Sequence, residues 1–341
     1  MERRILGRTG LDVSAIGFGC GMVGGLMVGG SVADQENAVA HALDCGIDYF
    51  DTAPFYGGGQ SEANLGRVLK QLRRRAVVGT KIRIDPATRD DPAQMHKLGT
   101  LIAASAEDSL RRLGTECLDL LQLHNPVSVS RAGSGLTPGV VLEEVLPAFQ
   151  RLVREGKVRF VGMSALGHAP DAIQVLEHGG FDTAQVAYSL LNPSAETPLP
   201  PAAQAEDYGR LLEPVRRGGI GVIGIRLLAG GSLSGSVERH PTAMRSVVPL
   251  GQGTGSGKDY EQDVAYARRF GFLVQEGLAR SLVAAALRYG LSNPTMHTLA
   301  IGFSSREQLT EAAQAAADGP FDRETLQRIS RVQMELGLAA G

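Results

Sequence analysis

Asp48-Tyr49-Phe50-Asp51-Thr52-Ala53-Pro54-Phe55-Tyr56-Gly57 holds the pattern that decides the fold. It begins with an apolar run of strand length, from Asp48 to Ala53, and continues into the glycine-rich loop Tyr56-Gly57-Gly58-Gly59. A segment of helical period follows, from Ser61 to Leu72. A strand, a loop and a longer helix in this order are typical of a parallel βα unit.

The same unit recurs along the whole chain. The predicted strands are Ala15 to Gly19, Asp48 to Ala53, Ala76 to Ile82, Leu118 to His124, Val158 to Ser164, Thr183 to Ser189, Gly221 to Leu228 and Thr298 to Phe303. The predicted helices are Asp34 to Cys45, Ser61 to Leu72, Gln94 to Leu113, Val140 to Glu155, Ala169 to Glu177, Gln204 to Arg217, Leu278 to Tyr289 and Arg306 to Ala317. This alternation predicts an α/β protein with a closed (β/α)8 TIM barrel, built as a single domain over residues 1–341, and an open doubly wound sheet is the alternative.

Some segments lie outside the repeat. Two short apolar runs around a glycine turn, between Arg3 and Ser14, predict an N-terminal β-hairpin that could plug the barrel floor. The connections His124 to Pro138 and Gly230 to about Gln275 are long, and the second contains Gly251-Gln252-Gly253-Thr254-Gly255-Ser256-Gly257. Long loops tend to be functional lids or disordered. Together with the tail after Pro320, these loops at the C-terminal face are the expected source of substrate selectivity.

Composition narrows the classes of function. The chain has 34 basic and 36 acidic side chains, a formal net charge of -2, and therefore no large field for nucleic acid. The most apolar stretch, Gly218 to Leu233, carries Arg226 at its middle, so no membrane helix is predicted. Cys20, Cys45 and Cys117 are too widely spaced for a disulfide scaffold or a zinc site, and a cytoplasmic location is expected. Nothing in the pattern indicates an oligomeric state.

Polar side chains at the ends of three successive predicted strands form the main functional signal. Asp51 and Tyr56 follow the second strand, Lys81 ends the third, and His124 ends the fourth. Taken singly, each has an ordinary structural explanation, such as a helix cap, a packing residue or a solvated tip. In a barrel, however, the carboxyl ends of the strands meet at one mouth, so we expect these four to lie together.

Together the four make chemical sense. A tyrosine with the ordinary pKa of about 10 is a poor proton donor near neutral pH, and a neighbouring ammonium lowers that pKa. Asp51 would keep Lys81 charged and oriented, while His124 would position a carbonyl oxygen beside the Tyr56 hydroxyl. This set suits reduction of an aldehyde or ketone, and a nicotinamide cofactor would have to supply the hydride.

Four stretches resemble the aldo-keto reductases: Leu6 to Ser14, Asp48 to Gly57, Thr80-Lys81 and Asp119 to His124. They occur in the family's order, and the resemblance covers nearly the whole chain. It implies an NADPH-dependent oxidoreductase that acts on a small-molecule carbonyl or sugar substrate. Tyr56 is then the implied general acid, Lys81 and Asp51 its tuning pair, and His124 the residue that orients the substrate.

The same resemblance implies the residues that hold the cofactor. Ser164 and Gln185 match groups that bind the nicotinamide carboxamide, and Ile301 to Leu309 matches the adenosine-phosphate segment, at a strand-to-helix turn suited to anions. The implied set is Gly19, Cys20, Gly21, Asp51, Ser164, Gln185, Ile225, Arg226, Leu228, Gly230, Gly302, Ser304, Ser305, Arg306, Gln308 and Glu311. Because Ser304, Ser305 and Arg306 could hold a 2′-phosphate, NADP(H) is favoured, and NAD(H) stays possible.

Some positions depart from the family pattern. Ala165 stands where most members have Asn or Arg, Ile225 where many have an aromatic ring, and Ala312 where Asn is frequent. Arg226-Leu227 replaces the common Ser-Pro. We hypothesise that Arg226 reaches the cofactor pyrophosphate, and an ion pair with a nearby acid is the alternative.

Other functions stay open at this point. Relatives of this type also run as dehydrogenases, with Tyr56 as the base. A nicotinamide-binding regulatory subunit similar to the potassium-channel β subunits would keep the fold with little turnover. A barrel lyase or isomerase that uses Lys81 as a Schiff-base nucleophile is a third interpretation, disfavoured because Thr80-Lys81 fits the reductase pattern.

Overall fold

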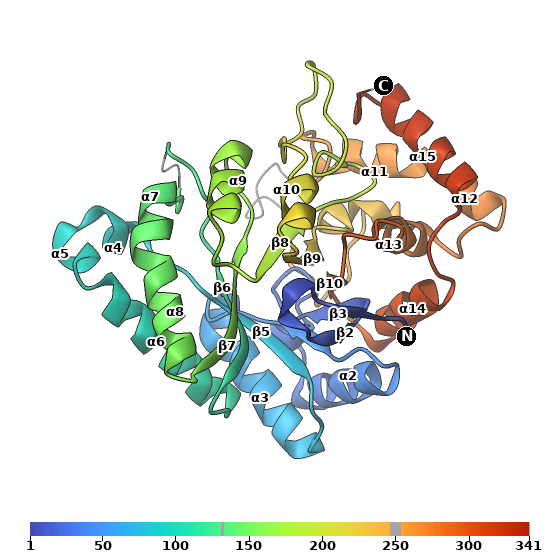
Figure 1. The fold of residues 1–341 in the computed structure, drawn as a ribbon. Coiled ribbons are helices and arrows are strands. Elements are labelled where there is room, and N and C mark those ends of the chain that lie inside the picture. Colours follow the sequence, from blue (N-terminus) through green and yellow to red (C-terminus); the bar gives the residue numbers. More distant parts are fainter. Residues whose placement is uncertain (131–132, 246–253, 341) are drawn as a thin grey trace.

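The structure is a computed structural model that describes residues 1–130, 133–245 and 254–340. In this part of the chain eight parallel strands close into a barrel, in the order β10-β3-β4-β5-β6-β7-β8-β9 (Figure 1). Their bounds are β3 (Ile16–Gly19), β4 (Tyr49–Asp51), β5 (Val77–Ile82), β6 (Leu118–Leu123), β7 (Val158–Ser164), β8 (Thr183–Ala187), β9 (Gly221–Ile225) and β10 (Thr298–Gly302). The predicted barrel is confirmed, and closure excludes the open sheet.

Helices follow the strands and cover the outside of the barrel (Figure 1). They are α2 (Val32–Asp44), α3 (Gln60–Leu72), α6 (Leu98–Leu113), α7 (Pro138–Val140) running through the π-helical η3 (Val141–Val145) into α8 (Leu146–Arg154), α9 (Ala169–His178), α10 (Leu212–Arg217), α13 (Leu282–Leu291) and α14 (Arg306–Ala317). Local chemistry sets their ends. In α2, for example, Ser31 and Asp34 form a capping box, and Gly46 at a φ of +80° follows the last turn.

Three predicted helices begin differently from the expectation. The helix predicted from Leu278 starts at Leu282, where the Ser281 side chain caps it. The helix predicted from Gln204 begins only at Leu212, because Gly209 and Arg210 both have positive φ and the backbone N–H of Tyr208 donates to the Ser194 hydroxyl. The helix predicted from Gln94 is divided into α5 (Pro92–Met95) and α6.

The connections contain more helix than predicted. They hold α1 (Leu26–Gly29), η2 (Tyr56–Gly59), α4 (Pro86–Asp90), η4 (Ala229–Ser234), α11 (Tyr260–Arg268) and α12 (Phe272–Gln275), and the tail after Pro320 forms α15 (Arg323–Glu335). The second long connection was expected to hold a glycine-rich stretch, and its first part, Gly251-Gln252-Gly253, lies outside the described residues. Among the described residues, no helix combines the length and apolarity needed to span a membrane.

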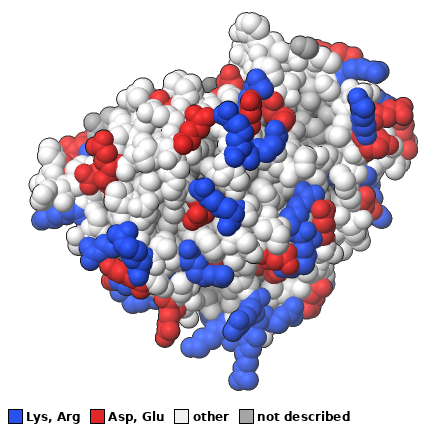
Figure 2. Space-filling model, in the orientation of Figure 1, with Lys and Arg blue, Asp and Glu red and all other residues white. Residues whose placement is uncertain are grey.

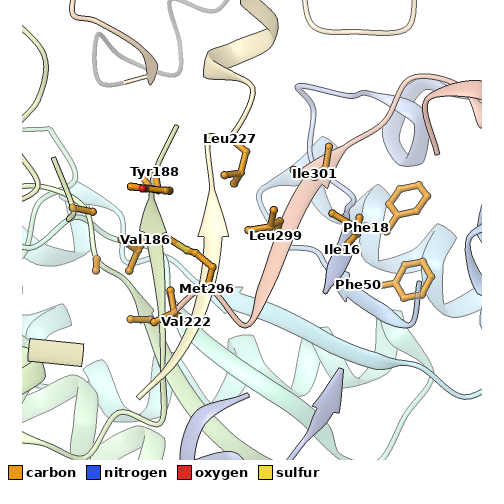
Figure 3. Packing of buried hydrophobic residues seen from close by; sticks show 14 of the residues in the cluster. Ile16, Phe18, Phe50, Val186, Tyr188, Val222, Leu227, Met296, Leu299 and Ile301 are labelled. Carbon is orange, nitrogen blue, oxygen red and sulfur yellow. The ribbon is translucent and has the colours of Figure 1, made fainter. Parts of the chain in front are cut away.

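The main apolar core joins buried residues of the strands, such as Phe18 and Ile301 (Figure 3), with buried residues of the helices, such as Val39 and Leu65. Phe18 on β3 stacks on Phe50 of β4, with ring centroids 5.5 Å apart, and meets Phe303 edge-on at 5.2 Å. Burying such aromatic pairs is a large part of the packing free energy of a barrel wall. The single domain over residues 1–341 stays a prediction, which one cooperative transition on heating would support.

The N-terminal hairpin closes the barrel floor. Its strands β1 (Arg3–Ile5) and β2 (Asp12–Ser14) pair antiparallel around η1 (Gly7–Thr9). Leu6, Leu11 and Val13 pack with barrel residues in a second buried cluster, separate from the main core. A Cβ at Gly7 would lie 2.3 Å from the backbone nitrogen of Gly221, so glycine is required where the hairpin meets β9. The predicted hairpin is confirmed.

The surface carries charges of both signs. Figure 2 shows acidic and basic side chains interspersed over the face in view. Many of them form exposed ion pairs, such as Arg328 with Glu276 at 2.6 Å and Arg280 with Asp318 at 2.9 Å. Pairs of this kind contribute little to stability individually, at about 0–1 kcal/mol.

Candidate active site

The structure brings Asp51, Tyr56, Lys81 and His124 together at the carboxyl ends of the strands. Asp51 ends β4, Lys81 lies near the end of β5, and His124 directly follows β6. Tyr56 begins η2, whose Gly57 has a φ of +61° that turns the loop back toward the barrel. The convergence expected from the sequence is therefore present as geometry.

Lys81 lies at the centre of the group. Its Nζ donates to Asp51 Oδ2 at 2.5 Å, to the Thr52 carbonyl at 2.9 Å and to Tyr56 Oη at 3.4 Å. The side chain is only 1% exposed. Burial lowers the pKa of Lys81, but the charge of Asp51 and the hydrogen bonds outweigh burial and raise that pKa. The ammonium stays protonated, which removes support for a Schiff-base nucleophile.

Asp51 is held by further donors: Gln185, expected only as a cofactor residue, and Gln122 and Tyr49, which the sequence analysis did not single out. Its Oδ1 accepts from Gln185 Nε2 at 2.6 Å, Gln122 Nε2 at 3.2 Å and Tyr49 Oη at 3.4 Å. A signal for two of them existed. Tyr49 precedes Asp51 by two residues and Gln122 precedes His124 by two, and this spacing places side chains on the same face of a strand.

Tyr56 places its hydroxyl beside the Lys81 ammonium, 3.4 Å from Nζ. Its ring meets the His124 ring edge-on, with centroids 5.9 Å apart, and the ring of Tyr56 also lies against Gly21. Burial raises the pKa of Tyr56, Lys81 opposes this, and the net direction is upward. The sequence analysis considered only the lowering by Lys81, so this expectation is corrected: in this structure burial outweighs the ammonium.

His124 is held neutral. Burial, followed by the charges of Lys81 and Arg83, lowers the pKa of His124 from 6.5 to about 3. Its Nδ1 is buried and finds no hydrogen-bond partner among the described residues. Arg83 stacks over the ring of Phe55 at 4.4 Å, and Phe55 is half exposed at the mouth. A neutral imidazole with an unpartnered nitrogen at a barrel mouth is suited to hydrogen bonding with a ligand.

The residues expected at the nicotinamide end are connected to the charged group. Ser164 Oγ donates to Gln185 Oε1 at 3.2 Å, and Gln185 in turn donates to Asp51. Gly19 ends β3, and the backbone N–H of the next residue, Cys20, donates to the Asp51 carbonyl at 2.8 Å. Burial raises the pKa of the Cys20 thiol well above its ordinary value, so the thiol is no nucleophile.

The turn after β9 is strained. Arg226 and Ala229 have φ values of +60° and +46°, in the region that favours glycine, and strained backbone of this kind gathers at functional sites. Arg226 Nη1 donates to Tyr208 Oη at 2.9 Å and to Glu206 Oε2 at 3.3 Å. The ion pair considered as the alternative for Arg226 is thus present. The sequence analysis gave neither Glu206 nor Tyr208 a role, because they precede Arg226 by 20 and 18 residues and no local pattern connects them to it.

Ile225, Leu228 and Gly230 accompany this turn. Ile225 ends β9 half-buried against the core, Leu228 precedes η4, and Gly230 lies within η4 at a φ of +68°. They lie at the same mouth as the charged group.

A pocket of about 390 Å³ opens where β10 turns into α14. Its lining residues are Leu26, Asp34, Asn37, His240, Thr242, Ser304, Ser305, Arg306 and Glu307. Three predicted cofactor residues, Ser304, Ser305 and Arg306, are therefore on its wall.

Several predicted cofactor residues of this segment, Ser304 among them, also make contacts within the protein. The Ser304 hydroxyl donates to the Gly24 carbonyl at 2.6 Å, and the Ser304 N–H donates to Gln308 Oε1 at 2.8 Å. Glu311 Oε1 accepts from the Ser281 hydroxyl at 2.5 Å, and Gly302 ends β10. The two Ser304 contacts hold the turn that shapes the pocket.

Comparison with known proteins identifies the group of sequences to which the chain is similar. The sequence model of the Aldo/keto reductase family matches residues 15–333. L-galactose dehydrogenase of Arabidopsis thaliana is 29% identical over 97% of this chain and 94% of its own length. A putative voltage-gated potassium channel subunit beta of Schizosaccharomyces pombe is 29% identical over 92% and 87%. The holo form of aldo-keto reductase AKR11C1 from Bacillus halodurans superposes with a TM-score of 0.71 at 24% identity over 97% and 96%, a likeness of fold.

Proposed function

Because the chain belongs to the aldo/keto reductase family, we propose that it is a nicotinamide-dependent oxidoreductase that interconverts a carbonyl group and the corresponding alcohol. The substrates are small molecules: an aldehyde, a ketone or an aldose. The observation that carries this proposal is the Lys81 ammonium, buried between the Asp51 carboxylate and the Tyr56 hydroxyl.

In the reducing direction Tyr56 is the proton donor. Its raised pKa keeps the hydroxyl protonated at neutral pH, and the adjacent Lys81 ammonium stabilises the negative charge that forms on Oη as the proton leaves. Asp51 keeps Lys81 charged and in place. In the oxidising direction the same hydroxyl, deprotonated beside Lys81, acts as the base.

His124 orients the substrate. Because its pKa is about 3, the ring is neutral at physiological pH and can donate one hydrogen bond to a carbonyl oxygen next to Tyr56. A neutral donor leaves Tyr56 as the source of the proton. Phe55, the half-exposed residue that precedes Tyr56, supplies an apolar wall for the substrate.

A bound reduced nicotinamide dinucleotide supplies the hydride that these side chains lack. The pocket at the start of α14, with Ser304, Ser305 and Arg306 on its wall, fits the adenosine end of that group. Ser164 and Gln185 would hold the carboxamide, and Ser304, Ser305 and Arg306 would face the adenosine end. For the 2′ position the sequence favours NADP(H), with NAD(H) as the alternative.

The relatives bear on substrate and role. The name of the Arabidopsis relative supports sugars among the candidate substrates and a dehydrogenase direction. The likeness to a putative potassium channel subunit supports a second candidate, a cofactor-binding regulatory subunit with little turnover. The complete group of Asp51, Tyr56, Lys81 and His124 favours the enzyme. The cytoplasm remains the proposed location, argued from the widely spaced cysteines.

The test is to mix the purified protein with NADPH or NADH and follow loss of the reduced nicotinamide on adding a panel of aldehydes, ketones and aldoses. We expect turnover with at least one substrate class. Tight dinucleotide binding without turnover on any substrate would favour the regulatory subunit. Absence of binding to either dinucleotide would contradict the proposal.

A further inference from the structure

We propose that the pocket at the N-terminus of α14 selects NAD(H) over NADP(H), and that Glu307 and Asp34 are the residues that exclude the 2′-phosphate. The inference rests on the proposed function, which assigns this pocket to the adenosine end of the cofactor. It reverses the preference for NADP(H) drawn from Ser304, Ser305 and Arg306 in the sequence.

Glu307 occupies the donors that a phosphate would need. It is the second residue of α14, after Arg306, and it lines the pocket. Its carboxylate accepts from its own backbone N–H and from the Ser305 hydroxyl, and these bonds, with the charges of Arg306 and His240, hold the pKa of Glu307 below its ordinary value. A helix N-terminus attracts anions through its free N–H groups. Here a carboxylate of the protein already takes that position.

Asp34 brings a second negative charge from a different element. It lies in the first turn of α2, where its Oδ2 accepts from the Ser31 hydroxyl at 2.6 Å and the Ser31 N–H at 3.3 Å. This capping box fixes the position of the carboxylate at the pocket wall. Because Asp34 lies on α2 and Glu307 on α14, the two carboxylates reach the pocket wall from different helices.

The charges of the pocket therefore favour a neutral group. Among its described lining residues, Asp34 and Glu307 each carry one negative charge, and Arg306 carries one positive charge. A 2′-phosphate would bring further negative charge against this net negative wall, whereas the 2′- and 3′-hydroxyls of NAD(H) can donate to carboxylates. In Rossmann-type folds an acidic residue accepts from the ribose 2′-hydroxyl of NAD and an arginine accommodates the 2′-phosphate of NADP, and the same charge argument applies to this pocket. Glu307, adjacent in sequence to Arg306, counters the one guanidinium here.

The experiment measures dissociation constants by calorimetry, with NADH and NADPH as probes and without any substrate. We expect the full-length protein to bind NADH at least about tenfold more tightly than NADPH. The double variant Asp34→Asn, Glu307→Gln keeps the size and polarity of both side chains. It should narrow the ratio at least about fivefold, mainly through tighter NADPH binding. Because both carboxylates also stabilise helix N-termini, the binding measurements are made well below the melting temperature of the variant.

Glu324→Gln is the matched control. Glu324 is also the second residue of a helix, α15, and follows Arg323 as Glu307 follows Arg306, but it lies outside the pocket. It should leave the ratio unchanged. NADPH bound as tightly as NADH by the unmodified protein would overturn the inference while leaving the proposed function standing. An equal effect of the control would also overturn it, and failure to bind either dinucleotide would overturn both.

Discussion

The two ends of the barrel use the same strands for opposite purposes. At the floor, Tyr49, Leu120 and Ile223 pack with the hairpin in a buried apolar cluster. At the mouth, two or four residues further along, the strands supply Asp51 and His124 and hold Lys81 in a buried ion pair. Burial of apolar side chains at the floor stabilises the folded state, whereas desolvation of the charged side chains at the mouth destabilises it. Stability and chemistry are thus separated by one or two layers of side chains.

The largest expected effect is on the ion pair at the mouth. Lys81→Met leaves the Asp51 carboxylate buried without its ammonium, and should lower the free energy of unfolding by about 3–5 kcal/mol. The double variant Asp51→Asn, Lys81→Met removes both charges and should recover most of that loss while staying inactive. Urea unfolding measures both. A double variant no more stable than Lys81→Met would contradict the contrast between the two ends.

The floor predicts the opposite combination. Leu6 is fully buried in the apolar cluster, so Leu6→Ala should lower the free energy of unfolding by about 2–5 kcal/mol. Turnover per folded molecule should be unchanged, because the hairpin that carries Leu6 closes the end of the barrel opposite Asp51, Lys81 and His124. The check is urea unfolding together with turnover at a temperature where the variant is fully folded. A large loss of turnover there would mean that the two ends are coupled.

His124 gives the mouth a pH dependence that the floor lacks. Its pKa is about 3 in the folded state and 6.5 ordinarily, so between these values the unfolded chain binds more protons. Stability should therefore fall as the pH drops from about 6.5 toward 3, by at most about 1.4 kcal/mol per pH unit from this group. His124→Asn should lose less stability than the unmodified protein between pH 7 and pH 5. An identical loss in both would show that His124 is not held neutral.

The smallest expected effect concerns the rim of the mouth. Arg226→Ala should weaken binding of the preferred dinucleotide by about tenfold if Arg226 also reaches the pyrophosphate, about 1.4 kcal/mol. Glu206→Gln, which removes the acid paired with Arg226, should not weaken binding. Calorimetric titration separates the two. An unchanged dissociation constant for Arg226→Ala would leave Arg226 a structural ion pair with Glu206.

Much of the fold could be predicted because each barrel strand is covered on both faces and therefore forms a continuous apolar run. The helix predicted from Arg306 to Ala317 has those bounds in the structure. The helix predicted from Gln204 was wrong at its start, since the segment is fixed by contacts of Tyr208 with Ser194, distant in sequence. Helix α15 was missed although Asp322 caps it, because the tail was considered only as a loop.

The candidate site could be predicted as far as strand ends reveal it. Asp51, Lys81 and His124 follow from the rule that barrel strands meet at one mouth. The net direction of a pKa shift at the site could not be predicted in the same way, because it depends on which of two opposing effects is larger. The sequence shows that Lys81 is near Tyr56, but only the structure shows that burial outweighs the ammonium and raises the pKa of Tyr56. Contacts across the barrel, such as Gln185 with Asp51, depend on closure and have no local signal.

The central claim is that the buried charge at the mouth serves proton transfer through Tyr56. Its most direct test compares Tyr56→Phe with the unmodified protein, using the best substrate and dinucleotide found. The account predicts that turnover falls by about 10²–10⁴-fold, while the dissociation constant for the dinucleotide and the melting temperature stay within error. Turnover within a few fold of the unmodified protein would contradict it.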